Sequence, residues 1–209
     1  MFINNPDLSV LPSYRISPFT TEYISFNHNL IEDNYADEYF DKRFGQDKYF
    51  FTLNGREGIH LALKCYNLKP NDIVTILTTT QNFYISSCVT NEIEKHCKWN
   101  REITSNTKII FVNHEFGYPY KEMDKLLELG IPIIEDCCTT FFSQDNNQKT
   151  GKYGDFSVYS FPKFFPIQIG LLIVKNNKDA FLDNSKINQI EIRYIKNVLS
   201  YHLKNEKEI

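Results

Sequence analysis

The 209-residue sequence has little of several features that mark particular classes of protein. It has no basic stripe, and its formal net charge of −3 is spread over mixed acids and bases, so we expect no nucleic-acid partner. No apolar run is long enough to cross a bilayer, and residues 1–7 lack the basic start and apolar stretch of a signal peptide. We therefore expect a cytoplasmic protein with no membrane partner.

Metal and redox motifs are also absent. The five cysteines are odd in number and irregular in spacing, which favours reduced thiols over a disulfide framework: Cys65, Cys88, Cys97, Cys137 and Cys138. No C-x-x-C or H-E-x-x-H spacing occurs, so the sequence predicts no metal site. No G-x-G-x-x-G follows a strand-like run, which argues against a dinucleotide-binding sheet.

The N-terminal residues lack a sustained hydrophobic period. Residues 1–50 are rich in aromatics and acids and contain Pro6, Pro12 and Pro18, so we expect an irregular arm with one short helix. A long unpatterned segment of this kind often packs on another body, which makes it a candidate dimer arm. The predicted organisation is this arm, an α/β domain over residues 51–178 and a helical tail over residues 179–209.

Strand-like and helix-like patterns alternate in the middle of the chain. Apolar runs of strand length occur at residues 72–77, 108–112, 131–136, 156–159 and 171–174, and helical patterns occur after residue 55, at 84–95 and at 121–129. Apolar runs without alternating polarity indicate strands that are covered on both faces. The order predicts an α/β fold with a mainly parallel sheet, whose ligands bind beyond the carboxyl ends of the strands.

Three segments at the ends of the predicted strands carry candidate functional residues. The turn at Asn54 and Gly55 opens a helix, whose free amides and dipole suit a phosphate, although an ordinary capped turn has the same pattern. Asp136 ends an apolar strand, where a carboxylate needs a cationic partner. Lys163 lies among prolines and aromatics, which would lower the pKa of its amine; the alternative is a lysine that keeps its charge in water.

Several motifs occur together and in a fixed order. They are the Asn54-Gly55-Arg56 turn, NHEFGYP at residues 113–119, IIEDCC at residues 133–138 and GDFSVYSFPK at residues 154–163. In this order they resemble the DegT/DnrJ/EryC1/StrS family of sugar aminotransferases over residues 51–176. The resemblance implies the large domain of a fold type I pyridoxal-phosphate (PLP) enzyme, with the C-terminal small domain largely missing.

The resemblance also implies roles for particular residues. Lys163 would hold PLP as a Schiff base and shuttle the proton, while Asp136 would pair with the pyridine nitrogen. The remaining cofactor-binding positions that it implies are Asn54, Gly55, Arg56 and Ser160 for the phosphate, Phe83 or Tyr84 over the ring, and Thr139 in place of the usual His or Gln. The alternative for Phe83 and Tyr84 is that they pack in the hydrophobic core and do not contact the cofactor.

In the family, glutamate is the amino donor, a nucleotide-linked keto-sugar is the acceptor, and two subunits of a homodimer share each active site. Surface polysaccharide synthesis is the implied process. One alternative is a catalytically inactive PLP-fold module that binds cofactor or a partner protein. Another is a metal or thiol enzyme that uses Cys137, Cys138, His114 or the His96/Cys97 pair.

Overall fold

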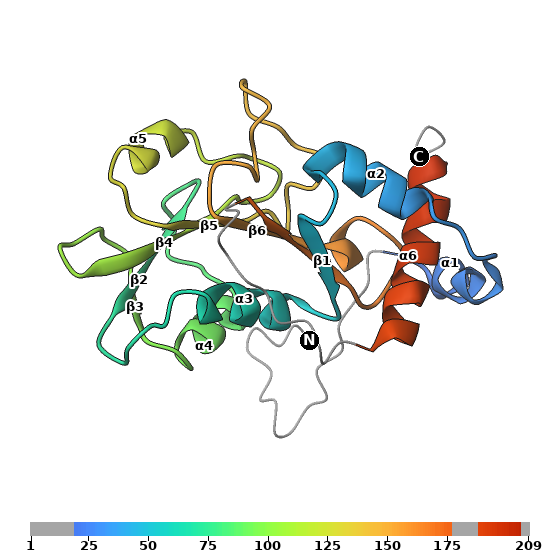
Figure 1. The fold of residues 1–209 in the computed structure, drawn as a ribbon, viewed down its shortest axis with the longest axis horizontal. Coiled ribbons are helices and arrows are strands. Elements are labelled where there is room, and N and C mark those ends of the chain that lie inside the picture. The colour runs from blue at the N-terminus through green and yellow to red at the C-terminus, as the bar shows by residue number, and fades with distance from the viewer. Residues whose placement is uncertain (1–18, 177–187, 206–209) are drawn as a thin grey trace, which may run out of the picture.

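The structure is a computed structural model that describes residues 19–176 and 188–205, so Pro6, Pro12 and Pro18 of the predicted arm lie outside the described residues. It contains one seven-stranded sheet with helices on both faces (Figure 1). The strands are β1 (Tyr49–Thr52), β2 (Ile73–Thr78), β3 (Lys98–Asn100), β4 (Thr107–Asn113), β5 (Ile133–Asp136), β6 (Phe156–Ser160) and β7 (Leu171–Lys175). The helices are α1 (Thr21–Phe26), α2 (Tyr35–Phe44), α3 (Gly55–Lys64), α4 (Ser87–Ile93), α5 (Met123–Leu127) and α6 (Gln189–Lys204), with 3-10 turns η1 (Asn27–Asn29) and η2 (Phe161–Lys163).

The strand order is β1-β7-β6-β5-β4-β2-β3. Strand β7 is antiparallel to both of its neighbours, β1 and β6, whereas all the other pairs are parallel. Every strand except β7 therefore ends at the same edge of the sheet. The predicted α/β class with a mainly parallel sheet is confirmed.

Alternate residues of the central strands pack into different cores. On β4, Ile109 and Phe111 join the core under α3 and α4, while Ile110 and Val112 join the core under α5. The four consecutive apolar residues of β4 are fully buried because both faces of the strand are covered.

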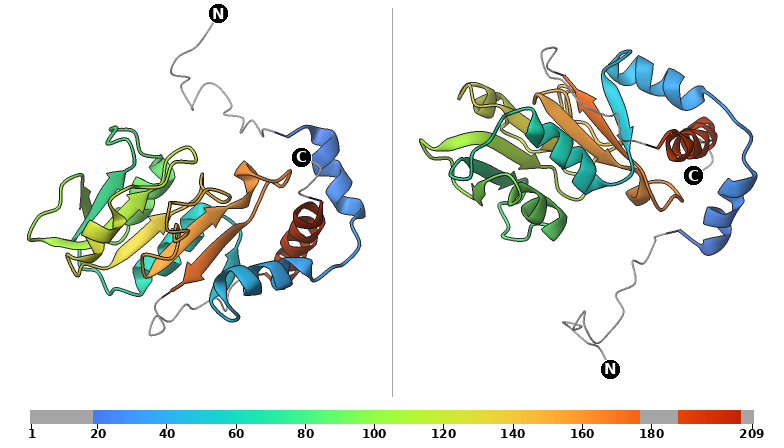
Figure 2. Two further views of the ribbon diagram at one scale, coloured as in Figure 1. Left: turned by 90° about the horizontal axis from the view of Figure 1, so that it is seen from above. Right: turned by 60° about the horizontal axis from the view of Figure 1, so that its bottom comes forward.

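Helices α2 and α6 cover the sheet near β7, at the end far from β3 (Figure 2). Polar contacts join α2 and the residues before it to α6. The Ser200 hydroxyl accepts from the Ala36 amide (2.8 Å) and donates to the Asp33 carbonyl (3.1 Å), and Lys196 Nζ lies 2.8 Å from Asp37 Oδ1. Within residues 19–50 the arm therefore contains two α-helices, where the sequence predicts one short helix, and α2 packs on the same chain. The division into arm, domain and tail stays a prediction.

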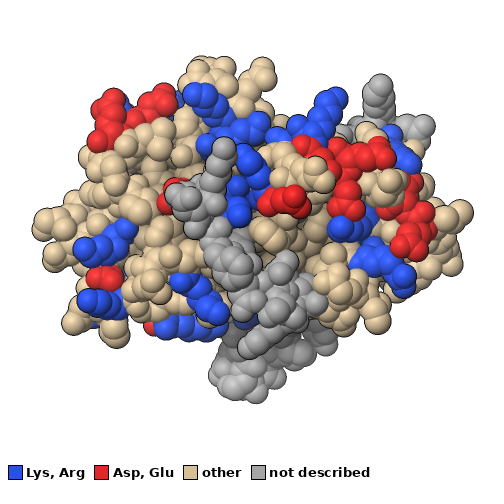
Figure 3. All heavy atoms as spheres, viewed as in Figure 1, with Lys and Arg blue, Asp and Glu red and all other residues tan. Residues whose placement is uncertain are grey.

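The charged surface agrees with the mixed composition. On the described part of the face shown in Figure 3, basic and acidic atoms are interspersed, and acidic atoms gather over α2, which contains Asp37, Glu38 and Asp41. Within residues 19–176 and 188–205, no helix is long and apolar enough to cross a membrane.

Candidate active site

The predicted site residues come from loops at one edge of the sheet. Strands β1, β5 and β6 end there, and they lead into Asn54, Asp136 and Lys163, respectively. The amino end of β7 reaches the same edge, because Leu171 is the partner of both Thr52 and Ser160. Three loops that are distant in sequence are therefore adjacent in space.

Gly170 connects two of these loops through its backbone. Its amide donates to the Leu53 carbonyl (2.8 Å), and its carbonyl accepts from the Phe161 amide (3.1 Å). Its φ of +109° is a conformation that favours glycine, and a Cβ would lie 3.1 Å from Phe161 and 3.3 Å from Ile195. Gly170 thus fixes the start of α3 relative to the lysine-bearing turn.

The N-terminus of α3 is capped by side chains. Asn54 Oδ1 accepts from the Glu57 amide (3.2 Å), and Glu57 Oε2 accepts from the Leu53 amide (2.9 Å). The amides of Gly55 and Arg56 are in the first turn, where no intrahelical acceptor exists. Arg56 itself is exposed, so its guanidinium is accessible at this helix end. The turn therefore offers both backbone donors and a cation to an anion.

Asp136 is an almost buried carboxylate, with an exposed fraction of 7%. Its Oδ1 accepts from the Cys138 amide (3.0 Å). Among the described residues, no lysine, arginine or histidine forms an ion pair with it. A buried carboxylate in this state favours a ligand that brings a positive N–H.

Lys163 ends the η2 turn and is exposed. The sequence left two interpretations open, an amine enclosed by apolar bulk and a lysine that keeps its charge in water. The structure agrees with the second, because Phe161 and Pro162 are buried whereas Lys163 is exposed. Lys163 lies close enough to Cys138 for its charge to lower the pKa of that thiol, against the larger raising effect of burial. Lys163 and Asp136 are therefore neighbours of the same cysteine.

The remaining predicted positions surround this edge. Ser160 is partly exposed at the end of β6, and the Thr139 hydroxyl donates to the His114 carbonyl (2.7 Å). Phe83 and Tyr84 follow β2 and are 93% and 72% exposed, so the alternative that they belong to the core is wrong.

The loop that carries Phe83 is fixed by a residue that the sequence did not single out. Glu115 Oε2 accepts from the amide and the hydroxyl of Thr80, both at 2.7 Å, and Glu115 Oε1 accepts from the Asn82 side chain. Glu115 is buried and lies in the loop after β4. It therefore joins the loops that follow β2 and β4, and its place in the NHEFGYP motif is the signal that could have identified it.

Glu135 is a second residue whose role the sequence did not reveal. It is fully buried, and it accepts from the amides of Gly151, Tyr153 and Gly154, each at 2.8 Å. It also lies 3.0 Å from Nε2 of His114. Four donors on one carboxylate hold the loop before β6 against the end of β5.

The tautomer of His114 follows from its partners. Its Nδ1 accepts from the Tyr120 amide (2.9 Å), so the ring proton is on Nε2 and is donated to Glu135. Both side chains are completely buried and satisfied by hydrogen bonds. This pair therefore holds the loops in position and offers no free ligand atom.

The thiols at the end of β5 are unsuited to nucleophilic chemistry. Burial raises the pKa of Cys137 and of Cys138 well above the ordinary range, and the charge of Asp136 acts in the same direction on both. A thiol nucleophile needs the opposite shift. The alternative of a thiol enzyme is therefore disfavoured.

Residues 35–170, which include all these loops, match the DegT/DnrJ/EryC1/StrS aminotransferase family. The chain belongs to this family. The DegT/DnrJ/EryC1/StrS enzymes normally use PLP.

A relative in this family is the GDP-perosamine synthase of Escherichia coli O157:H7, which is 29% identical over 170 residues. The match covers 68% of this chain and 45% of the relative, so the chain spans less than half of the relative's length. Among solved structures, the aminotransferase TlmJ from Streptoalloteichus hindustanus has a TM-score of 0.65 at 16% identity, over 90% of this chain and 66% of that chain. The aminotransferase from Psychrobacter cryohalolentis has a TM-score of 0.64 at 14% identity, over 92% of this chain and 65% of that chain. These structures share the fold of the large domain.

Proposed function

We propose that the chain is a PLP-dependent aminotransferase that moves an amino group from glutamate to a nucleotide-linked keto-sugar in surface polysaccharide synthesis. Asp136 is the observation that carries this proposal. It is an almost buried carboxylate that has no cationic side-chain partner among residues 19–176 and 188–205. It lies at the sheet edge that also holds Lys163 and the start of α3. The pyridinium N–H of PLP is a donor of the charge and kind that Asp136 lacks.

The other residues at this edge fit the rest of the cofactor. The amides of Gly55 and Arg56, with the helix dipole, would bind the phosphate, together with the hydroxyl of Ser160. When bound, PLP supplies a carbonyl that takes up an amino group and a ring that accepts electron density. Lys163 would attach the cofactor and then move the substrate proton as a base and acid. Asp136 would keep the ring nitrogen protonated.

The aromatic face of the cofactor has two candidate partners. Phe83 or Tyr84 would cover the ring, because both are exposed on the loop after β2 that Glu115 holds. Thr139 would border the ring from the loop after β5, with its hydroxyl held by the His114 carbonyl.

The substrate proposal rests on the family and on the relative. The name of the GDP-perosamine synthase indicates a product in which GDP is linked to an amino sugar. A GDP-linked keto-sugar is therefore the first acceptor to test, with glutamate as donor.

A homodimer is also proposed. Large aromatic side chains are exposed on loops at the same edge as the site, and a second subunit would remove them from water: Phe83, Tyr84, Phe116, Tyr118 and Phe142.

The test begins with cofactor attachment. The chain is mixed with PLP, the visible absorbance is recorded, and the mixture is reduced with borohydride and mapped by peptide. We expect the reduced PLP label to be found on Lys163. The label should be lost in Lys163→Ala and retained in the control Lys152→Ala, which alters an exposed lysine. A label elsewhere, or a Lys163→Ala protein that still shows the absorbance, would contradict the proposal.

Turnover is measured next, as 2-oxoglutarate released from glutamate in the presence of a GDP-linked keto-sugar. We expect Asp136→Asn to keep the Cys138 contact but to lower the rate by roughly 100-fold or more, because the charge opposite the ring nitrogen is lost. The second candidate is an inactive PLP-fold module. It predicts labelling of Lys163 with no 2-oxoglutarate release.

A further inference from the structure

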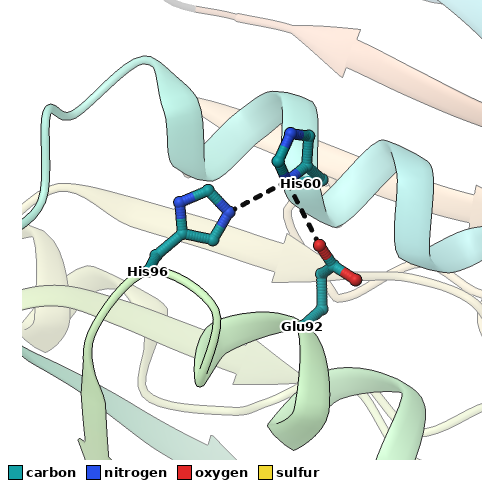
Figure 4. A group of neighbouring side chains, drawn as sticks. All are labelled: His60, Glu92 and His96. Atoms are coloured by element: carbon teal, nitrogen blue, oxygen red, sulfur yellow. Dashed lines mark hydrogen bonds and ion pairs between the residues drawn. The ribbon is translucent and has the colours of Figure 1, made fainter.

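A second cluster of chemically active side chains lies between α3 and α4. It consists of His60 on α3, Glu92 on α4 and His96 in the turn after α4, and the three side chains point toward one another (Figure 4). His60 Nδ1 is 3.0 Å from His96 Nε2 and 3.2 Å from Glu92 Oε1. One ligand atom from each residue lies within 4.8 Å of the others.

Hydrogen bonding alone satisfies this arrangement poorly. A neutral imidazole nitrogen either donates one proton or accepts one. If His60 Nδ1 donates its proton to Glu92, no second proton remains on this nitrogen for His96. If His60 Nδ1 instead accepts a proton from His96, the lone pair of this nitrogen lies beside the carboxylate of Glu92 without a proton between them. A cation among the three atoms would receive lone pairs from all of them. Four-coordinate zinc, with bonds of about 2.0–2.1 Å, places neighbouring ligand atoms roughly 3.3 Å apart, close to both observed contacts.

The surroundings prepare these groups to act as ligands. Glu92 is 2% exposed, and Lys95 Nζ lies 2.6 Å from its Oε2, which fixes the carboxylate and leaves Oε1 toward His60.

We propose that His60 Nδ1, Glu92 Oε1 and His96 Nε2 bind a divalent transition metal of the zinc class, with water completing the coordination. The half-exposed His60, at 43%, leaves a route from solvent. His96 precedes β3 by two residues, so the cluster is near the amino end of that strand, whereas the candidate active site is at the carboxyl ends. The metal site is therefore independent of the proposed function.

The other triplet of potential ligands, His114, Glu135 and Cys137, differs in one respect. Its carboxylate and imidazole are fully engaged by backbone amides and by each other. Within the described part of the chain, the cluster at His60 has only the Lys95 contact and the contacts among its own members. Free ligand atoms are thus found at the α3–α4 cluster.

The test is a titration of the tag-free chain with CoCl2, followed by displacement with ZnCl2. We expect one equivalent of cobalt to produce visible d–d bands without the near-ultraviolet charge-transfer band of a thiolate, because all three ligands are nitrogen or oxygen. His60→Ala and His96→Ala should each weaken cobalt binding by at least about 100-fold. Even the loss of a residue that only hydrogen-bonds to a metal ligand lowers metal affinity by roughly 10–100-fold. His28→Ala removes an exposed histidine outside the cluster and should bind as the unaltered chain does.

Three results would overturn the proposal. They are the absence of a saturable one-equivalent site, a thiolate band that assigns the metal to a cysteine such as the exposed Cys88, and equal affinity in His60→Ala and His28→Ala. Alanine is favourable within α3, so His60→Ala should fold, and far-ultraviolet circular dichroism checks this. Zinc should also raise the Tm of the unaltered chain and of His28→Ala, but not that of His60→Ala.

Discussion

At the scale of single residues, the charges that organise the loops are buried acids. Glu135 has no exposed surface, yet it satisfies three backbone amides and one imidazole. A carboxylate has enough lone pairs for these four donors, and the donors balance the cost of burying its charge. Glu135 thus holds three amides of the loop at residues 151–154, and the Asn176 side chain donates to the carbonyls of Gly151 and Gly154.

We expect Glu135→Gln to destabilise the protein by about 3 kcal/mol or more, because the amide nitrogen of glutamine would face donors and leave them unpaired. The measurement is the free energy of unfolding from urea denaturation. Glu128→Gln, an exposed position after α5, should change it by less than about 0.5 kcal/mol. Equal effects of the two substitutions would show that the amide contacts of Glu135 contribute little.

The sequence identified Asp136 correctly as a nearly buried carboxylate, because a strand of apolar residues leads into it. It left two surroundings open for Lys163, enclosure by apolar side chains and exposure to water, because neighbours in sequence are not necessarily neighbours of the amine. The backbone of η2 buries Phe161 and Pro162 while exposing the lysine. The metal ligands at His60, Glu92 and His96 escaped the motif search for a related reason: they come from two elements that tertiary packing brings together.

At the scale of elements, α3 has a defined beginning. Asn54 caps the helix by accepting from Glu57, and it also precedes the amides proposed to bind phosphate. Asn54→Ala should lower stability by about 1 kcal/mol, since the Glu57 amide loses its acceptor. Urea denaturation measures this, with the exposed Asn106→Ala as the control that should stay within about 0.5 kcal/mol. A control that loses as much stability as Asn54→Ala would contradict the capping role.

Helix α6 contains a buried titratable group. His202 is 8% exposed, its Nε2 lies 3.3 Å from Asn27 Oδ1, and burial lowers its pKa below the ordinary 6.5. The unfolded chain therefore binds the proton more readily than the folded chain. This group leaves stability unchanged above pH 6.5 and lowers it as the pH falls from about 6.5 toward the folded pKa.

We accordingly expect the urea midpoint to fall less between pH 7.5 and pH 5.5 in His202→Gln than in the unaltered chain. The exposed His28→Gln should retain the full decrease. The two variants are compared because other groups also titrate in this range, His96 among them. A decrease in His202→Gln as large as that in His28→Gln would contradict the prediction.

Five of the seven strands could be predicted, because their apolar runs are covered on both faces. The two that were missed, β1 and β3, are edge strands of four and three residues with partly buried positions, so their sequences lack a strong pattern. The sequence predicts one unplaced helix in the arm, where the described part has two, for a similar reason. Only Ala36 and Phe40 are buried on α2, and its contact with α6 comes from a segment distant in sequence.

At the scale of the whole molecule, the exposed aromatics beside the site favour a dimer. We expect sedimentation equilibrium at micromolar concentration to show two copies, and Phe83→Lys to weaken their association by at least about tenfold, because a charge would enter an apolar contact. Ile190→Glu, which alters an exposed apolar residue at the start of α6, is the control. A monomeric unaltered chain would exclude a shared active site.

The antiparallel strand β7 has a consequence for biosynthesis. Strand β1 is at the sheet edge and pairs with β7. Tyr49 can therefore pair with Val174 only after the ribosome has synthesised a further 125 residues. At a translation rate of about 5–20 residues per second, this delay is roughly 6–25 s. During that interval β1 of the ribosome-bound chain lacks its strand partner, and the Leu53 carbonyl before α3 lacks the Gly170 amide that donates to it. The end of α3 that is proposed to bind phosphate therefore reaches its native contacts late, although it is encoded in the first third of the chain.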